Sequence, residues 1–406
     1  MKNLDSKKIY FIFIIILIIG SLVYFFFFKN KDISITNEQE ISFPTNSVGE
    51  IDLSGEFLKI NVDGENTDLD SLKAEVPFIR KISSQPIVGA YLFNLKDIEE
   101  IFIRYIEKSS GHIYETSTNT LTIDRISNTT IPGLFKTYWL DQDNFVMQYI
   151  DTDKIKSYLA YLKNNQDGLK TLEGKYLVDD IKDLFFLNKK IFYTTENENS
   201  LIGIITDLNG EDAKYTFESP LKEWLISKIT DTKLAFNSKT SENTLGYLFV
   251  FDLNNGEFKK YLGDKVNLSS LMNSNSDILY SENYRSQFKL SVYNNVSKTS
   301  TEMTLKTLPE KCLWAKDKIK IFCAIPNNYI NPNDLDNWYK GKIFFNDSLW
   351  LIDTKTNEAK KIIDLENVTG EKIDIIDIKI DEKEKYLIFT NKINFDLWTL
   401  KIPEIL

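Results

Sequence analysis

Histidine and arginine are scarce in this chain of 406 residues, which contains a single histidine, His112. One histidine and two cysteines cannot supply a Cys/His zinc cluster, and no H-E-x-x-H motif occurs. A G-x-S-x-G motif is also missing, which argues against a serine hydrolase. A sialidase would need an arginine cluster, whereas the few arginines are spread along the chain: Arg80, Arg104, Arg125 and Arg285. We therefore predict no metal, no cofactor and no catalytic residue that a motif identifies.

Positive charge is in the minority, and the formal net charge is −10. Binding to a phosphate backbone depends on clustered lysine and arginine. An acidic chain with so little arginine does not suit that role. We therefore predict no nucleic-acid partner.

One long hydrophobic run is present, over residues 9–28, without a charge or a proline. About 20 apolar residues in a helix span a bilayer core of about 30 Å. No small-residue cleavage site follows, so the run predicts an uncleaved transmembrane helix rather than a signal peptide. The lysines before and after it favour, by a small margin, a cytoplasmic tail over residues 1–8. We expect a stalk over residues 29–53 and a domain over residues 54–406, outside the cytoplasmic membrane.

The rest of the chain repeats one pattern, in which a β-run, a polar turn and a second, more polar run follow one another. A preceding hairpin recurs as well, so each repeat holds four strands, which is typical of a β-propeller blade. The spacings are 45, 45, 45, 43, 59 and 48 residues. The seven copies begin at His112, Ser157, Ile202, Tyr247, Leu290, Leu349 and Leu397. We therefore predict an all-β fold, a seven-bladed propeller with four antiparallel strands in each blade.

The last copy ends too early to hold its outer strand. Residues 54–61 (SGEFLKIN) resemble the fourth-strand text NGEFKKYL at 255–262. We expect Gly55–Ile60 to complete the last blade, because an open sheet edge would otherwise be exposed.

Several segments resemble known propeller repeats. WAKDKIKIF (314–322), SLWLIDTKTNEAKKI (348–362) and KYLIFTNKINFDLWTL (385–400) are similar to WD40-like or TolB-like blades. GHIYE, RISNTTIPG and NWYKGKIFFNDSLW resemble segments of uncharacterised, membrane-anchored bacterial propeller proteins. The resemblance covers roughly residues 86–402 and implies an architecture rather than an activity, since propellers carry many unrelated functions.

Aspartates and tryptophans recur at equivalent places in the repeats, which favours structural roles. Aspartate bonds its own backbone in tight turns, and large rings at equivalent positions pack between blades. His112, where a third strand is expected to begin, is interpreted as a packing or turn residue. The aspartates expected in hairpin turns are Asp141, Asp143, Asp207, Asp252 and Asp353, and the tryptophans expected in the core are Trp139, Trp224, Trp314, Trp350 and Trp398.

The spacing of 59 residues reveals an insert, residues 326–342 (PNNYINPNDLDNWYKGK), between the second and third strands of one blade. In an up-and-down blade this loop lies at the same end as the connections between blades. Aromatic rings beside carboxylates suit a sugar or peptide ligand. The candidate ligand-binding residues are Tyr329, Asp334, Asp336, Trp338 and Tyr339. Two alternatives remain: a loop packed on its own blade around Trp338, and a calcium site at Asp334 and Asp336, which lacks the glycine and distal glutamate of an EF-hand.

The two cysteines, Cys312 and Cys323, flank one expected hairpin turn near Asp317 and Lys318. In that register they lie opposite each other on one face, so the sequence predicts a disulfide if the compartment is oxidising.

These observations favour a non-enzymatic display module that is held at the membrane by residues 9–28 and binds a protein, peptide or glycan of the envelope. Two alternatives stay open. One is a propeller-fold carbohydrate-active enzyme with paired carboxylates, which composition alone does not exclude. The other is a structural subunit of an envelope assembly.

Overall fold

The structure is a computed structural model that describes residues 76–95, 98–164, 169–239, 241, 243–332 and 334–403, all within the unit Ser54–Leu406. The tail, transmembrane helix and stalk expected over residues 1–53 lie outside these residues. An N-terminal transmembrane helix was expected, but none is found in the described ranges, where no helix is long and apolar enough to cross a membrane.

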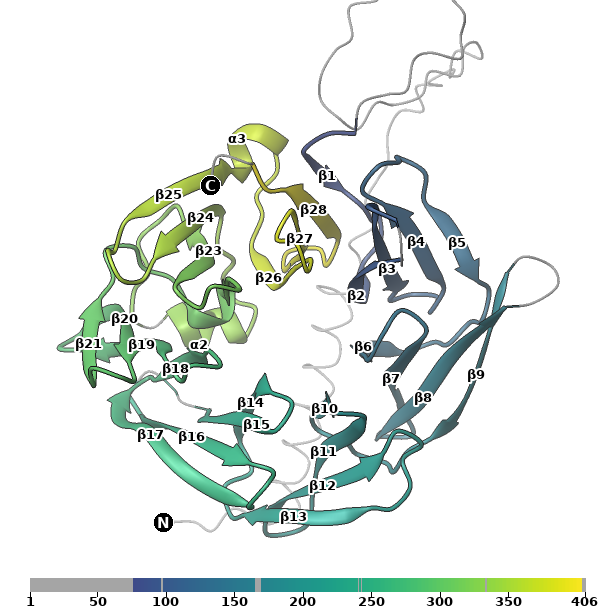
Figure 1. Ribbon diagram of the computed structural model, residues 1–406, viewed down its shortest axis with the longest axis horizontal. Helices are drawn as coiled ribbons and strands as arrows, with labels where there is room; N and C mark the ends of the chain where they lie inside the picture. The colour runs from purple at the N-terminus through teal and green to yellow at the C-terminus, as the bar shows by residue number, and fades with distance from the viewer. Residues whose placement is uncertain are drawn as a thin grey trace, which may run out of the picture. The chain divides into compact units, whose positions relative to one another are not determined.

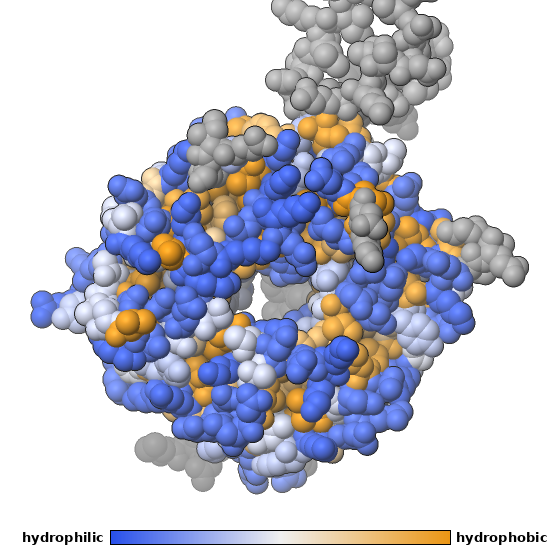
Figure 2. All heavy atoms as spheres, viewed as in Figure 1, coloured by the Kyte–Doolittle hydropathy of each residue, from blue (hydrophilic) through white to orange (hydrophobic). Residues whose placement is uncertain are grey.

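Twenty-eight strands in the described residues form sheets that follow one another around a ring in chain order (Figure 1). The strands of each blade run from one near the centre of the ring to one at its outside (Figure 1). This arrangement is that of a β-propeller, as the repeats predicted. Side chains leave a hollow at the centre of the ring, and the face in view is mostly hydrophilic (Figure 2).

The prediction of seven separate blades is wrong. The described residues form five separate four-stranded sheets, while β2 to β9 join into a single eight-stranded sheet. The join is one parallel bridge between β5 and β9, at Ser127 and Lys170. A repeat pattern reports the hairpins within each copy, not the pairing of outer strands from two copies, so the sequence could not show this merger. The strands of this sheet are β2 (Ile87–Asn94), β3 (Ile101–Glu107), β4 (Ile113–Ser117), β5 (Asp124–Ser127), β6 (Leu134–Trp139), β7 (Asn144–Asp151), β8 (Lys154–Asn164) and β9 (Lys170–Tyr176).

The next four sheets are meanders of consecutive antiparallel strands. The first contains β10 (Leu184–Leu187), β11 (Lys190–Glu196), β12 (Leu201–Asp207) and β13 (Lys214–Ser219). The second contains β14 (Trp224–Thr230), β15 (Lys233–Ser238), β16 (Leu245–Asp252) and β17 (Glu257–Val266). The third contains β18 (Ser269–Met272), β19 (Ile278–Tyr284), β20 (Gln287–Asn294) and β21 (Thr299–Glu302). The fourth contains β22 (Cys312–Trp314), β23 (Lys320–Pro326), β24 (Asp347–Asp353) and β25 (Ala359–Asp364).

The last sheet is closed by a strand from the start of the described chain. It combines β26 (Ile375–Ile380), β27 (Tyr386–Asn391) and β28 (Leu397–Lys401) with β1 (Ile79–Lys81), which pairs antiparallel with β28. The segment expected to close it, 54–61, lies outside the described residues, and the N-terminal strand that pairs with β28 is β1. β1 suits the place because it pairs its backbone with β28 and also buries Ile79 among residues of this blade and the previous one.

The core lies between neighbouring sheets. Phe322 and Leu351 of one sheet share a buried cluster with Leu387 and Trp398 of the next. Several strands, such as β15, β23 and β27, are buried on both faces, and these short apolar runs are the signal that predicted strands in the sequence. The helical pieces are short: η2 (Pro309–Lys311), α2 (Asp334–Tyr339) and α3 (Leu365–Thr369).

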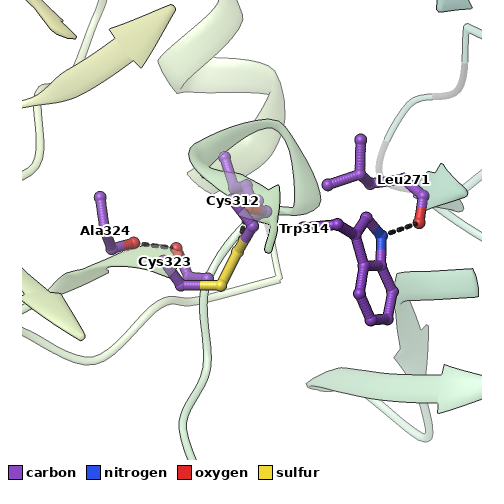
Figure 3. Close-up of a disulfide and its surroundings, with 7 residues drawn as sticks. Leu271, Cys312, Trp314, Cys323 and Ala324 are labelled. Carbon is purple, nitrogen blue, oxygen red and sulfur yellow. Dashed lines mark hydrogen bonds between the residues drawn. A yellow bond between two sulfur atoms is a disulfide. The ribbon is translucent and has the colours of Figure 1, made fainter. Parts of the chain in front are cut away.

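Cys312 and Cys323 are directly opposite in the β22–β23 ladder and form a disulfide, with their Cα atoms 4.1 Å apart (Figure 3). Two residues further on, the Trp314 indole Nε1 donates to the Leu271 carbonyl oxygen at 3.2 Å (Figure 3). The disulfide therefore ties two strands of one blade together, and the indole links that blade to β18 of the previous one.

Candidate functional site

The insert lies where the sequence placed it, between the second and third strands of the β22–β25 blade. Its helix α2 contacts the segments that connect this blade to its neighbours: η2, which precedes β22, and residues 365–374, which precede β26. Figure 1 shows α2 beside β18 and β23, toward the centre of the ring. We call the propeller face that carries α2 and these connections the insert face.

Trp338 is buried, with 4% of its surface exposed. It packs in a cluster with Phe288, Leu308, Leu335 and Phe345, and its indole Nε1 donates to Asp374 Oδ2 at 2.8 Å. A ligand-contact role would require the ring to face solvent, and it does not. Trp338 acts as the plug of the insert, the packing alternative that the sequence had left open.

Asp334 and Asp336 do not converge on a common point. They are two residues apart on α2, and residues at that spacing do not face each other on a helix. Asp334 accepts from the backbone N–H and the side-chain Nδ2 of Asn331, which starts the helix, and Asp336 lies 3.9 Å from Lys340 Nζ in a surface ion pair. Both carboxylates therefore have partners within or next to α2.

The two tyrosines of the insert differ. Tyr329 is exposed over 68% of its surface. The phenol of Tyr339 donates to Glu310 Oε1, so α2 is fastened to η2. Burial of this phenol, with the Glu310 charge beside it, raises the pKa of Tyr339 well above its ordinary value.

A buried ionic cluster lies beneath the insert, formed by Lys311 of η2, Asp347 of β24 and Asp374 before β26. All three side chains are fully buried. Lys311 Nζ lies 2.7 Å from Asp347 Oδ2, pairs with Asp374 Oδ1, and donates to the Ile375 carbonyl oxygen at 3.0 Å. Because Asp374 also accepts from Trp338, this cluster anchors α2 to two blades at once.

The cluster holds one cation and two carboxylates, so it carries an excess negative charge in the interior. Asp347 shows the consequence: burial raises its pKa to about 6, the neighbouring Asp374 acts in the same direction, and Lys311 opposes the shift. Its Oδ1 also has no hydrogen-bond partner in the described part of the chain.

The stability of this protein is expected to fall as the pH rises through about 6 because of Asp347. A carboxyl group whose pKa is raised in the folded state contributes stability that is full below the unfolded pKa, near 4, and is lost as the pH rises through the folded pKa. We expect this contribution to change by about 2–3 kcal/mol between pH 4.5 and pH 7.5. Urea unfolding of the wild type and of Asp347→Asn at both pH values measures it. The variant, which cannot ionise, should show a flatter dependence, and an identical pH dependence in the two proteins would contradict the assignment.

Aromatic and apolar side chains are exposed on the same face, and lysines lie over two of the rings. Phe344, which follows the insert, and Phe395 of the β27–β28 loop expose 47% and 41% of their surfaces. Lys392 Nζ lies 5.9 Å from the Phe344 ring and 4.1 Å from the Trp338 ring. Lys108, in the β3–β4 turn, lies 5.2 Å from the Phe395 ring. We call the set Tyr339, Phe344, Lys392, Ile393, Phe395 and Lys108 the aromatic–lysine patch.

This patch crosses three blades, since its residues come from three successive connections between second and third strands. Lys392 joins two of them: its backbone N–H donates to the Asp374 carbonyl oxygen at 2.7 Å and its Nζ donates to the Trp338 carbonyl oxygen. Burial lowers the pKa of Lys392. The patch is therefore held on a rigid base rather than on free loops.

The recurring residues occupy the structural places expected for them. Asp207, Asp252 and Asp353 each accept from backbone N–H groups of the following turn, and Asp141 does the same for Asp143 and Asn144. Asp143 additionally pairs with Arg104 at 3.0 Å. His112 Nε2 lies 3.2 Å from Thr130 Oγ1 in a turn. Of the tryptophans expected in the core, two are buried (Trp314 and Trp398) and three are half-buried (Trp139, Trp224 and Trp350).

The enzyme alternative requires paired carboxylates, and Asp347 and Asp374 are two carboxylates that share one lysine. A glycosidase pair must reach the substrate and water. These two are sealed from solvent and share Lys311, so their geometry serves packing rather than acid–base chemistry. No group of three or more His, Cys, Asp or Glu side chains in the described ranges could hold a metal ion.

The ionic cluster and the patch were both missed by sequence reasoning. Lys311 sits in the segment TLPEKCLW as an ordinary polar residue, and its carboxylate partners lie 36 and 63 positions further along. The signal in the sequence was a lysine between a Pro-Glu turn and a predicted strand, which does not identify its partners. Phe344 and Phe395 resemble any other strand-flanking phenylalanine.

Comparisons with known proteins identify no family. No family model matches this chain, and no curated protein matches it. Solved structures similar to it include the β-propeller domain of Cps50 (Swd1) from Myceliophteria thermophila (10% identity, 80% of this chain and 100% of that chain, TM-score 0.46). TolB from Acinetobacter baumannii is another (11% identity, 77% and 78%, TM-score 0.42), as is the β-propeller domain of the Trilobed protease from Pyrococcus furiosus (14% identity, 64% and 78%, TM-score 0.42). The relationships are distant, membrane anchoring is not shown by them, and the propeller assignment rests on the strand topology described above.

Proposed function

We propose that this protein is a non-catalytic binding module whose partner is a protein or peptide that docks on the aromatic–lysine patch. The observation that carries the proposal is the exposure of Phe344 and Phe395 on a base fixed by the buried ionic cluster. Exposed aromatic rings on a rigid scaffold are enriched at protein interfaces, where they give contact area at little entropic cost.

The place of the patch also supports binding. Loops held by a rigid scaffold commonly carry binding residues, and the aromatic–lysine patch combines side chains from the loops of three blades. The insert needs no such rings for its own packing, which Trp338, Leu335 and Phe345 already provide. Lysines beside the rings favour a partner with carboxylates near apolar side chains.

We also propose a location outside the cytoplasm. The Cys312–Cys323 disulfide supports it, because disulfides persist in oxidising compartments and are rare in the cytosol.

The double change Phe344→Ser and Phe395→Ser in the full chain is expected to reduce recovery of the natural partner at least tenfold. Quantitative mass spectrometry after crosslinking to an envelope extract measures this recovery, with melting temperature as the check on folding. Both rings are already partly in water, so the melting temperature should move by only about 2 °C.

The matched control is Tyr176→Ser with Tyr215→Ser, which removes two exposed rings from the outer strands β9 and β13. This control should keep full partner recovery. Unchanged recovery with the patch variant, or equal loss with the control, would refute the patch as the docking surface.

A further inference from the structure

Three buried oxygen atoms on the insert face have no hydrogen-bond partner within the described part of the chain: Asn267 Oδ1, Ser281 Oγ and Glu310 Oε2. We call them the oxygen cluster. Ser281 is fully buried and Asn267 is 1% exposed. A buried polar atom without a partner costs free energy, so a group of them at one place calls for an explanation.

The strand register brings these atoms together. Ser269 of β18 is directly opposite Ser281 of β19, so their side chains stand on the same face. Ser269 Oγ donates to Glu310 Oε1 at 2.6 Å, which places the Glu310 carboxylate over that face. Ser281 therefore stands next to Ser269, on the face over which the Glu310 carboxylate lies.

Asn267 connects the oxygen cluster to the insert. Its Nδ2 donates to the Pro332 carbonyl oxygen at 3.3 Å, and Asn283 Nδ2 donates to the same oxygen at 3.2 Å. Asn283 is two residues from Ser281 on β19 and so shares its face. Because the amide nitrogen of Asn267 is used by Pro332, its Oδ1 is the acceptor that remains.

The surroundings are rich in oxygen and poor in donors. Both donors that reach the Glu310 carboxylate, the hydroxyls of Ser269 and Tyr339, go to its Oε1. Its Oε2 therefore has no hydrogen-bond partner in the described residues. Lys311, the next residue, is turned to Asp347 and Asp374 instead.

We propose that the oxygen cluster is a binding site for a hard metal cation, held by the Glu310 carboxylate and by neutral oxygens of Asn267 and Ser281. Carboxylate, amide and hydroxyl oxygens are the ligands that Ca²⁺ prefers, and few charged ligands give affinities of about 0.1–1 mM, as in extracellular modules. Na⁺ shares this chemistry. The cation would join the β18–β21 blade to η2 and, through Pro332 and Tyr339, to the insert.

The experiment titrates the full chain, first treated with chelator, with Ca²⁺, Mg²⁺ or Na⁺ at constant ionic strength and follows its melting temperature. The wild type is expected to gain about 2 °C in a saturable manner at 10 mM Ca²⁺. Tyrosine-sensitised Tb³⁺ luminescence gives a direct binding readout, since Tyr339 touches Glu310. A response to Na⁺ but not to Ca²⁺ would support the monovalent form of the site.

Two variants separate the cation site from a water-filled pocket. Ser281→Ala removes an unpartnered hydroxyl, and Glu310→Gln replaces the free oxygen by an amide donor. Both should be at least as stable as the wild type without cation, and both should lose the thermal shift and at least tenfold in Tb³⁺ affinity. Thr216→Val, which removes another unpartnered buried hydroxyl oxygen on β13, should keep the full cation response.

The absence of any saturable cation response in the wild type would overturn the proposal in favour of bound water. So would an equal response in Ser281→Ala, Glu310→Gln and Thr216→Val. The Phe344 and Phe395 rings are not part of the oxygen cluster, so the docking variant that removes them should keep the full cation response, although Tyr339 of the patch donates to Glu310.

Discussion

Replacing Lys311 with methionine is expected to lower the free energy of unfolding by about 3–5 kcal/mol at pH 7.5. The change leaves Asp347 and Asp374 fully buried without the ammonium group that lies between them. Removing one partner of a buried ion pair is costly because the remaining charge is desolvated and uncompensated. Urea unfolding followed by tryptophan fluorescence measures the loss. The loss should be smaller at pH 5, where protonation of Asp347 removes one of the two buried negative charges.

Lys340→Met is the matched control. Lys340 is 60% exposed and lies 3.9 Å from Asp336 in a surface pair, which is typically worth less than 1 kcal/mol. We expect a change below about 0.5 kcal/mol for this variant. Equal unfolding midpoints for the two lysine variants would show that the cluster does not hold the insert face together.

Replacing Ile79 with aspartate is expected to cost more than about 4 kcal/mol, since it places a charge without a partner in the core at the ring closure. Ile79 is opposite Leu400 in the β1–β28 ladder and packs among residues from two blades. Loss of β1 would expose the edge of β28 and release the last blade. We expect a lower melting temperature, and early proteolytic cleavage at β26–β28 in limited digestion.

Phe78→Ser, at the neighbouring position, controls for the local change in sequence. Phe78 exposes 49% of its surface, so its replacement should shift the stability by no more than about 0.5 kcal/mol. If Ile79→Asp were no more harmful than Phe78→Ser, β1 would not be the strand that closes the ring.

The blades were predictable because their signals are local. A hairpin such as β22–β23 is recognisable from two apolar runs on either side of a polar turn at Asp317, whose carboxylate accepts from the N–H groups of Ile319 and Lys320. Repetition of such hairpins then implies a propeller. The location of the insert was predictable for the same reason, because it interrupts an otherwise regular spacing.

The contents of the insert were only partly interpretable. Trp338 looked like a ligand-binding ring because it stood outside the repeat pattern, yet it is the plug of the loop. Whether Trp338 binds a ligand or packs the loop depended on Asp374, which lies 36 positions further along and accepts the indole N–H of Trp338. Asp334 and Asp336 looked paired in the sequence, but residues two positions apart on a helix do not face each other.

The sequence by itself determined that this chain folds into four-stranded β units arranged as a propeller, since strand periodicity and turn residues act over fewer than about ten neighbours. Tertiary structure alone decided how the units join: β1 as the closing strand, the bridge that merges β2–β9 into one sheet, the Lys311 cluster and the oxygen cluster. Each of these depends on pairings between residues tens to hundreds of positions apart. A single sequence does not encode them locally, because the partner of a buried charge or strand edge is fixed only when the blades pack.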